Sequence, residues 1–263
     1  MADFVVSEEE WERGCLDAAK VERIAAAFVD VGLVSIANVL PLEVCDSLRE
    51  QMDHDSAHMA AQRMWVRAPG HLQQGLPRIG PCVPREVVAN PIIEQLAFAI
   101  LGPCHISFFN GNSNLPGSSP QILHCDGPWH VRSAEQAAER GEEWPPKPAS
   151  VSVTFSPSEM SPANGSTEGT NPSPPSPLRG SCRALIECWA SVWPGTHRIP
   201  EFAAPEFMNG EVLPLQLEEA EARNPAALQL IEHRRATHPP RQALVPKGGV
   251  MLRDGRGWHR VRL

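Results

Sequence analysis

Ile122-Leu123-His124-Cys125-Asp126 is the stretch of sequence from which the fold prediction starts. Two apolar residues lead directly into a histidine and an aspartate that are two positions apart. In an extended strand, residues i and i+2 point to the same face of the sheet. An imidazole and a carboxylate in this arrangement can bind one metal ion side by side. The stretch therefore predicts a β-strand that carries two metal ligands, His124 and Asp126.

A second histidine from a distant strand would complete the metal site. One carboxylate and two histidines form the facial triad of non-haem Fe(II) oxygenases, which leaves positions open for a co-substrate and O2. The best candidate is His259, which follows the segment Asp254-Gly255-Arg256-Gly257-Trp258. We therefore predict that His124, Asp126 and His259 are the metal ligands.

Other histidines are weaker candidates for metal binding. His130 would share a face with the first two predicted ligands on an unbroken strand, but Gly127-Pro128 interrupts that strand. His54 and His58 have the i, i+4 spacing of zinc ligands on a helix but lack the glutamate of a zinc-protease helix. We expect these two side chains to lie on a solvated helix face. His197 is expected to hydrogen-bond a loop.

Composition limits the possible partners and compartments. The 263 residues include 23 basic and 31 acidic side chains, for a net charge of −8, which argues against nucleic acid or an anionic membrane surface as a partner. Seven cysteines without a Cys-x-x-Cys pair indicate a reducing compartment. Neither a signal peptide nor a membrane-spanning apolar run is evident. We expect a soluble cytoplasmic protein, with a peroxisomal location as the alternative, although the sequence carries no convincing peroxisomal signal.

The periodicity of apolar residues predicts helices first and short strands later. Helical spacing covers residues 16–30, 41–62, 91–101 and a stretch near 215–223. Alternating or apolar runs predict strands over residues 33–36, 105–109, 120–125, 150–155 and 249–252. Together with 27 prolines, this pattern indicates a mainly β fold with flanking helices, an antiparallel sandwich or barrel.

Several phrases, in the same order along the chain, resemble the phytanoyl-CoA dioxygenase (PhyH-like) family, especially its fungal members. They include Gly32-Leu33-Val34-Ser35-Ile36, Leu101-Gly102-Pro103, Asn114-Leu115-Pro116-Gly117-Ser118, Gln121-Ile122-Leu123-His124-Cys125-Asp126, Asn164-Gly165-Ser166-Thr167, Trp193-Pro194-Gly195-Thr196-His197-Arg198 and Asp254-Gly255-Arg256 before Trp258-His259-Arg260. The resemblance spans nearly the whole chain.

The resemblance implies a double-stranded β-helix (a jelly-roll, cupin-like fold) backed by helices, and an enzyme that uses Fe(II), 2-oxoglutarate and O2. By this likeness His124, Asp126 and His259 would bind iron, and Gln121 and Thr167 would contact 2-oxoglutarate. Oxidative decarboxylation of 2-oxoglutarate to succinate would be coupled to oxidation, such as hydroxylation, of a small organic molecule. Fungal relatives often act in secondary metabolism, while others take acyl-CoA substrates.

Two departures from the family pattern matter. We expect one domain over residues 1–263, but residues 169–191 form a Pro- and Ser-rich insertion, which we interpret as an error in the gene model. Relatives also continue into a further strand that carries an arginine about ten residues after the distal histidine. This arginine pairs with the far carboxylate of 2-oxoglutarate. We expect this last strand to be missing.

These departures leave two alternatives to the oxygenase prediction. The first is a truncated, non-catalytic jelly-roll protein, or a gene-model artefact, that keeps only the metal-binding framework. The second is a cupin-like zinc or manganese protein that uses the same side chains without 2-oxoglutarate. Substrate, oxidation outcome and oligomeric state are not fixed by the sequence.

Overall fold

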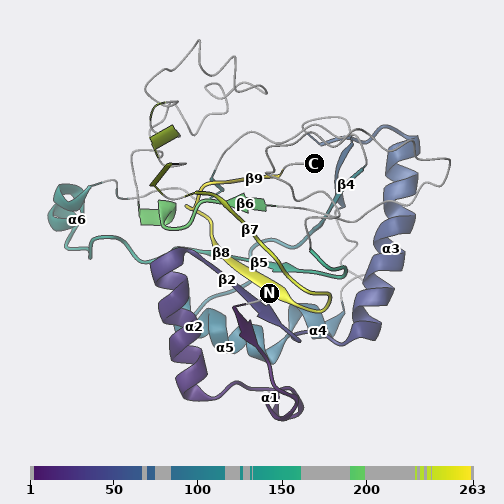
Figure 1. Cartoon of the computed structure of the whole chain (residues 1–263), viewed down its shortest axis with the longest axis horizontal. Helices are drawn as coiled ribbons and strands as arrows, with labels where there is room; N and C mark the ends of the chain where they lie inside the picture. Colours follow the sequence, from purple (N-terminus) through teal and green to yellow (C-terminus); the bar gives the residue numbers. More distant parts are fainter. Residues whose placement is uncertain are drawn as a thin grey trace.

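The structure is a computed structural model of the chain. It describes residues 3–66, 70–74, 84–115, 125–126, 131, 133–160, 190–198, 229, 232–233, 236–237 and 239–261. The helices are α1 (Glu8–Arg13), α2 (Ala18–Val31), α3 (Leu42–Ala61), α4 (Arg85–Val88), α5 (Pro91–Leu101), α6 (Ala134–Arg140) and the 3-10 helix η3 (Thr196–Arg198). In the described ranges, helices flank sheets, with α2 at the lower left and α3 on the right of Figure 1.

The strands form three sheets. A four-stranded sheet has the order β1-β2-β8-β5, a hairpin pairs β3 with β4, and a three-stranded sheet has the order β7-β6-β9. Their bounds are β1 (Phe4–Val5), β2 (Leu33–Ala37), β3 (His71–Gln74), β4 (Gly111–Asn114), β5 (Val151–Phe155), β6 (Ala190–Val192), β7 (Arg241–Gln242), β8 (Val250–Asp254) and β9 (His259–Val261). Only β1 and β2 pair in parallel; the other described pairs are antiparallel.

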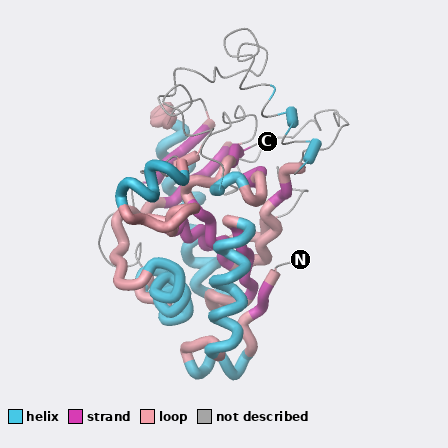
Figure 2. The backbone as a smooth tube through the Cα atoms, turned by 90° about the vertical axis from the view of Figure 1, so that its left-hand side faces the viewer, coloured by secondary structure: helices cyan, strands magenta, loops and turns pink. Residues whose placement is uncertain are grey.

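Helices α2 and α5 cover one face of the four-stranded sheet. Val21, Ile24 and Phe28 recur at helical spacing on α2 and are buried against the sheet. Asn90 is the N-cap of helix α5, and its side chain accepts hydrogen bonds from the amides of Ile92 and Ile93. Figure 2 shows helices and strands in adjacent layers. This layer holds the central strand β8 in place.

Six predicted elements are confirmed and one is wrong. The helices expected over 16–30, 41–62 and 91–101 are α2, α3 and α5, and the strands expected over 33–36 and 150–155 are β2 and β5, while the run at 249–252 continues into β8. The strand expected over 105–109 is absent; these residues have no regular structure, and the described strand begins at Gly111. Gly111 lies opposite Gln74, where the described partner strand β3 ends. Ile106 and Phe108 accordingly remain 62% and 69% exposed.

Other predictions fall on parts of the chain that the structure does not describe. Residues 120–124 and the helical stretch at 215–223 lie outside the described residues. So does most of the predicted insertion at 169–191, of which only Ala190 and Ser191 are described, as the first residues of β6. The insertion therefore stays a prediction, although its expected end at 191 falls inside a strand. Among the described helices, none is both long and apolar enough to cross a bilayer.

Candidate metal centre

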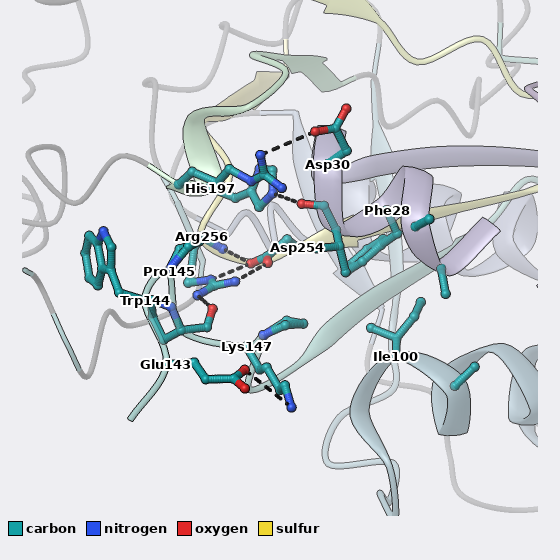
Figure 3. Close-up of a pocket in the computed structure, with 17 residues that line it drawn as sticks. Phe28, Asp30, Ile100, Glu143, Trp144, Pro145, Lys147, His197, Asp254 and Arg256 are labelled. Atoms are coloured by element: carbon teal, nitrogen blue, oxygen red, sulfur yellow. Dashed lines mark hydrogen bonds and ion pairs between the residues drawn. The ribbon is translucent and has the colours of Figure 1, made fainter. Parts of the chain in front are cut away.

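The connection between β8 and β9 is held by a buried ion pair. The guanidinium of Arg256 donates from Nε and Nη2 to the two oxygens of Asp254, at 3.0 and 2.6 Å, and from Nη1 to the carbonyl of Pro146 at 2.7 Å. Both side chains are less than 7% exposed, and Figure 3 shows them pointing toward each other. A two-pronged contact of this kind fixes orientation as well as distance. It therefore fixes the turn that leads to His259.

The first residues of β9 are fixed by η3. The hydroxyl of Thr196 donates to the carbonyl of Trp193 at 2.7 Å and accepts from the amide of Trp258 at 2.9 Å. The amide of Trp193 donates to the carbonyl of Trp258 at 3.0 Å. Both tryptophans are fully buried. These contacts fix the backbone directly before His259, the first residue of β9.

His197 ties this turn to helix α2 rather than to a loop, the partner that the sequence analysis expected. Its Nε2 lies 2.9 Å from the carbonyl of Val29, and the ring is buried. Burial lowers the pKa of His197, opposed by the bond to Val29 and the charge of Asp254, so the folded protein holds a neutral imidazole. The imidazole ring lies against Gly32, whose φ of 78° ends α2 in the left-handed region.

Gly32 provides a stability prediction. A Cβ added there would lie 2.4 Å from Nδ1 of His197. Gly32→Ala should lower the free energy of unfolding by about 2–3 kcal/mol, because backbone strain and a steric clash add together. The measurement is urea unfolding of both proteins. Gly141→Ala is the matched control, since Gly141 has a φ of 68° and nothing within 4 Å; an equal loss in both variants would remove the clash from the explanation.

His197 provides a prediction of pH dependence. The unfolded chain binds a proton near pH 6.5, whereas the folded protein resists protonation until lower pH. The free energy of unfolding should therefore fall as the pH decreases from about 6.5, by up to about 1.4 kcal/mol for each unit by which folding lowers the pKa. Urea unfolding at pH 7.5 and 5.5 measures this slope. His197→Gln should flatten it and His54→Gln, on an exposed helix face, should not; an unchanged slope in both would contradict the assignment.

Asp126 and His259 lie next to each other although they are far apart in the sequence. The amide of Asp126 donates to the carbonyl of Gly255 at 2.8 Å, which fixes Asp126 beside the β8–β9 turn. Oδ2 of Asp126 lies 3.2 Å from Nε2 of His259. The His259 side chain is 7% exposed and that of Asp126 45%, so the pair is open on the carboxylate side. Two of the three predicted ligands are therefore adjacent.

Arg253 on β8 contacts both of these residues. Its Nη2 lies 2.5 Å from Oδ2 of Asp126, and its Nη1 lies 3.1 Å from Nδ1 of His259. Partial burial opposes ionisation of Asp126, but the hydrogen bond with His259 and the charge of Arg253 outweigh it, and the pKa of Asp126 lies well below its ordinary value. The carboxylate is therefore ionised, which is the form that a metal ion binds.

The two donor atoms fit a metal ion. Nδ1 of His259 lies 3.1 Å from the carbonyl oxygen of Gly257. Nη1 of Arg253, which can only donate, lies 3.1 Å from the same Nδ1, and Nε2 faces the carboxylate of Asp126, so without a metal ion Nε2 carries the proton that is donated to Asp126. A metal ion at Nε2 would require the tautomer with the proton on Nδ1, where the carbonyl of Gly257 can accept it. Donor atoms that are each about 2.1 Å from one metal ion, at right angles to each other, are about 3 Å apart. The separation of 3.2 Å between Asp126 and His259 is close to this value.

The remaining predicted site residues are not described. His124, Gln121 and Thr167 lie outside the described residues, and so does the weaker candidate His130. Within the described part of the chain, no group of three or more His, Cys, Asp or Glu side chains is placed to hold a metal ion. His54 and His58 are exposed on α3, as expected. Cys125 is partly buried, and burial raises the pKa of its thiol, which fits a packed side chain.

Arg253 is the residue of this site that the sequence analysis missed. The strand predicted over residues 249–252 ended one residue before Arg253. A charged residue that continues an apolar strand is a signal of an interior partner, because buried cations are paired. With that rule, Arg253 would have been linked to a carboxylate such as Asp126.

A cavity of about 780 Å³ lies on the other side of this region. Phe28, Ile100, Trp144 and the Asp254–Arg256 pair are among its lining residues. Neither Asp126 nor His259 lines it. Successive residues of a strand point to opposite faces, so Asp254 faces the cavity and its neighbour Arg253 faces the candidate metal centre. The cavity is therefore separate from that centre.

No protein-family model matches the sequence. Solved structures do resemble the fold. The non-heme alpha ketoglutarate dependent epimerase SnoN from nogalamycin biosynthesis is 14% identical, with a TM-score of 0.51, and the match covers 94% of this chain and 78% of SnoN. The corresponding values are 14%, 0.49, 94% and 78% for the non-heme alpha ketoglutarate dependent carbocyclase SnoK, from the same biosynthesis. They are 15%, 0.48, 94% and 71% for the apo form of EctD from S. alaskensis.

At 14% identity the likeness to SnoN concerns the fold alone. Sheets flanked by helices are observed, as the sequence predicts, while the full double-stranded β-helix remains a prediction. The fold of this chain thus resembles that of SnoN, and in it an aspartate and a histidine lie side by side.

Proposed function

We propose that this protein is an Fe(II)/2-oxoglutarate-dependent oxygenase that oxidises a small organic molecule. The observation that carries the proposal is the separation of 3.2 Å between Oδ2 of Asp126 and Nε2 of His259. His124, two positions before Asp126, would complete the facial triad. Gln121 and Thr167 remain proposed contacts of 2-oxoglutarate.

The described residues have distinct tasks in this proposal. Iron bound at the site would couple decarboxylation of 2-oxoglutarate by O2 to oxidation of the substrate. Asp126 and His259 would hold the ion, and the carbonyl of Gly257 orients the imidazole. His259 and, after it, Arg253 lower the pKa of Asp126 and keep its carboxylate ionised. The Asp254–Arg256 pair fixes the turn from which His259 extends.

The supporting observations concern the fold and the metal site, so the proposal names a class of reaction and no particular substrate. SnoN is an epimerase from an antibiotic pathway, and that reaction belongs to SnoN. For this chain, a role in secondary metabolism, a small-molecule substrate and a single oxygenase domain remain proposals. Hydroxylation is one of several oxidation outcomes that the same iron chemistry supports.

Succinate formation tests the proposal. Purified protein is given Fe(II), ascorbate and 2-oxoglutarate under air, and succinate is quantified by mass spectrometry. Slow succinate release without any added substrate is the expected result, and it should disappear without O2 or when Zn²⁺ replaces Fe(II). Tight Fe(II) binding without succinate would contradict the proposal.

A second candidate function is a non-catalytic protein of the same fold. The contact of 2.5 Å between Arg253 and Asp126 favours it, because the guanidinium already neutralises the carboxylate that a metal ion would need. This candidate predicts that neither Fe(II) nor Mn²⁺ binds at micromolar concentration. Isothermal titration with Mn²⁺ therefore separates the two functions before any turnover is measured.

A further inference from the structure

We propose that the cavity beside the Asp254–Arg256 pair is a second ligand site, which binds a neutral and largely apolar small molecule. The cavity lies away from the candidate metal centre, because neither Asp126 nor His259 is among its lining residues. Its size, the chemistry of its walls and the pairing of its charges support the proposal. Binding there needs no metal ion, so the inference does not rest on the proposed function.

The size and the walls of the cavity suit a small ligand. Its volume of about 780 Å³ lies within the range of about 300–1,000 Å³ that is typical of small-molecule sites, which are lined mainly by apolar side chains. Apolar walls come from the second half of α2, the last turn of α5 and residues 143–148. Figure 3 shows Trp144 on one side of the cavity and Phe28 and Ile100 on the other.

The walls include apolar side chains that are left in contact with solvent. Val29 is 48% exposed and Trp144 37%. Ala26 on α2 and Ala99 on α5 are exposed as well, and their short side chains leave room for a ligand in the cavity. Removal of apolar surface from water is favourable in proportion to its area. The walls therefore favour an apolar ligand over water.

The charged side chains of the cavity are already paired with each other. Among the described residues, three acidic and three basic side chains line it, and they form three ion pairs. The pairs are Asp30 with Arg198 at 3.3 Å, Glu143 with Lys147 at 3.5 Å, and Asp254 with Arg256 at 2.6 Å. An ionised ligand would leave water for a place that offers no net counter-charge, which is unfavourable. The pairing therefore favours a neutral ligand.

One wall of the cavity is rigid before any ligand binds. Residues 143–148 include three prolines, Pro145, Pro146 and Pro148, and the ring of each fixes its φ angle. Nη1 of Arg256 donates to the carbonyl of Pro146 at 2.7 Å and holds this segment against the β8–β9 turn. A wall that is ordered in advance loses little conformational freedom when a ligand binds. The site is therefore preformed along this wall.

A neutral fluorescent probe tests the inference without metal or turnover. N-Phenyl-1-naphthylamine is uncharged, and its emission rises in apolar surroundings. The protein is titrated into a fixed, low concentration of the probe. We expect saturable binding with a Kd below about 100 µM, an ordinary affinity for a ligand of this size. Absence of saturable binding in this range would overturn the inference.

Two cavity-filling variants show where the probe binds. Ala26→Leu and Ala99→Leu each place a larger side chain into the cavity, from different helices, and each should weaken probe binding by about tenfold or more. Both positions are exposed and leucine is a good helix former, so both variants should fold, as circular dichroism would show. If one of them does not fold, the other carries the test.

A matched variant on α3 controls for the added leucine. Ala57 is exposed and does not line the cavity, so Ala57→Leu should leave the affinity for the probe unchanged. A loss in a filling variant that Ala57→Leu does not share would support the inference. Unchanged affinity in every folded filling variant, or an equal loss in Ala57→Leu, would overturn it.

A charged probe and a metal ion test the remaining parts of the inference. 8-Anilinonaphthalene-1-sulfonate has the same aromatic framework with an added sulfonate and should bind about tenfold more weakly or worse. Equal or tighter binding of the sulfonate would overturn the assignment to neutral ligands. Addition of Mn²⁺ should leave the affinity for N-phenyl-1-naphthylamine unchanged. Displacement of that probe by Mn²⁺ would place it at the metal centre and overturn the inference.

Discussion

The Asp126→Ala variant is expected to lose Fe(II) binding and to form succinate more than about a hundredfold more slowly than the unmodified protein. Removal of the partners of metal ligands alone reduces affinity or activity by about 10–100-fold, and a ligand should matter more. Asp126 also supplies the negative charge in its contact with His259 and Arg253. Titration with Mn²⁺ and succinate quantification measure the two effects.

A matched surface variant controls for the loss of a carboxylate. Asp46 forms an ion pair of 2.6 Å with Lys247 and is 66% exposed, so Asp46→Ala should leave metal binding and succinate formation unchanged. Circular dichroism shows whether Asp126→Ala remains folded with Arg253 unpaired. A folded Asp126→Ala protein that binds Mn²⁺ with normal affinity would remove Asp126 from the ligand set.

Asp254→Ala is expected to cause the largest loss of stability, about 3–5 kcal/mol of unfolding free energy. Removal of one partner from a buried ion pair leaves an unpaired charge inside the protein. Here the partner is Arg256, whose side chain is 6% exposed and would lose two hydrogen bonds to the carboxylate, while its backbone amide would lose a third. Urea unfolding monitored by tryptophan fluorescence measures the change.

Two comparisons identify the cause of that loss. The double variant Asp254→Ala/Arg256→Met removes both charges and should be more stable than Asp254→Ala alone, because no buried charge is left unpaired. Asp17→Ala breaks an exposed pair with Arg13 of the same 2.6 Å length and should have a far smaller effect. A double variant that is less stable than Asp254→Ala would show that packing around Arg256, rather than charge, dominates.

The elements that the sequence predicts well are those whose apolar spacing is local. Helix α2 has a regular stripe of Val21, Ile24 and Phe28 and ends at a glycine, so both its face and its end follow from the sequence. Strand β3, with two glutamines among its four residues, has no apolar alternation. Its buried Gln74 is stabilised by hydrogen bonds to Ser56 and to the carbonyl of Met52 on α3. Hydrogen bonds between distant parts of the chain, such as these, produce no periodic pattern of apolar residues in the sequence.

The wrong strand at 105–109 has a similar cause. Its alternating Ile106 and Phe108 satisfy the local rule, but strand formation also needs a partner in register, and β3 pairs with Gly111–Asn114 instead. In the site, the pairing of Asp126 with His259 was predictable, because the motifs His124-Cys125-Asp126 and Trp258-His259 contain residue types that bind iron. The role of Arg253 was not, since only the fold brings β8 beside Asp126.

The position of β8 also bears on how the protein is made. This strand lies between β2 and β5, and Val34 pairs with Leu252, more than two hundred residues later in the chain. During synthesis, β2 therefore has one backbone edge without its partner strand until nearly all of the described chain has left the ribosome. The central sheet is thus assembled late and depends on loop closure over most of the polypeptide, which makes the nascent chain a natural client for chaperones.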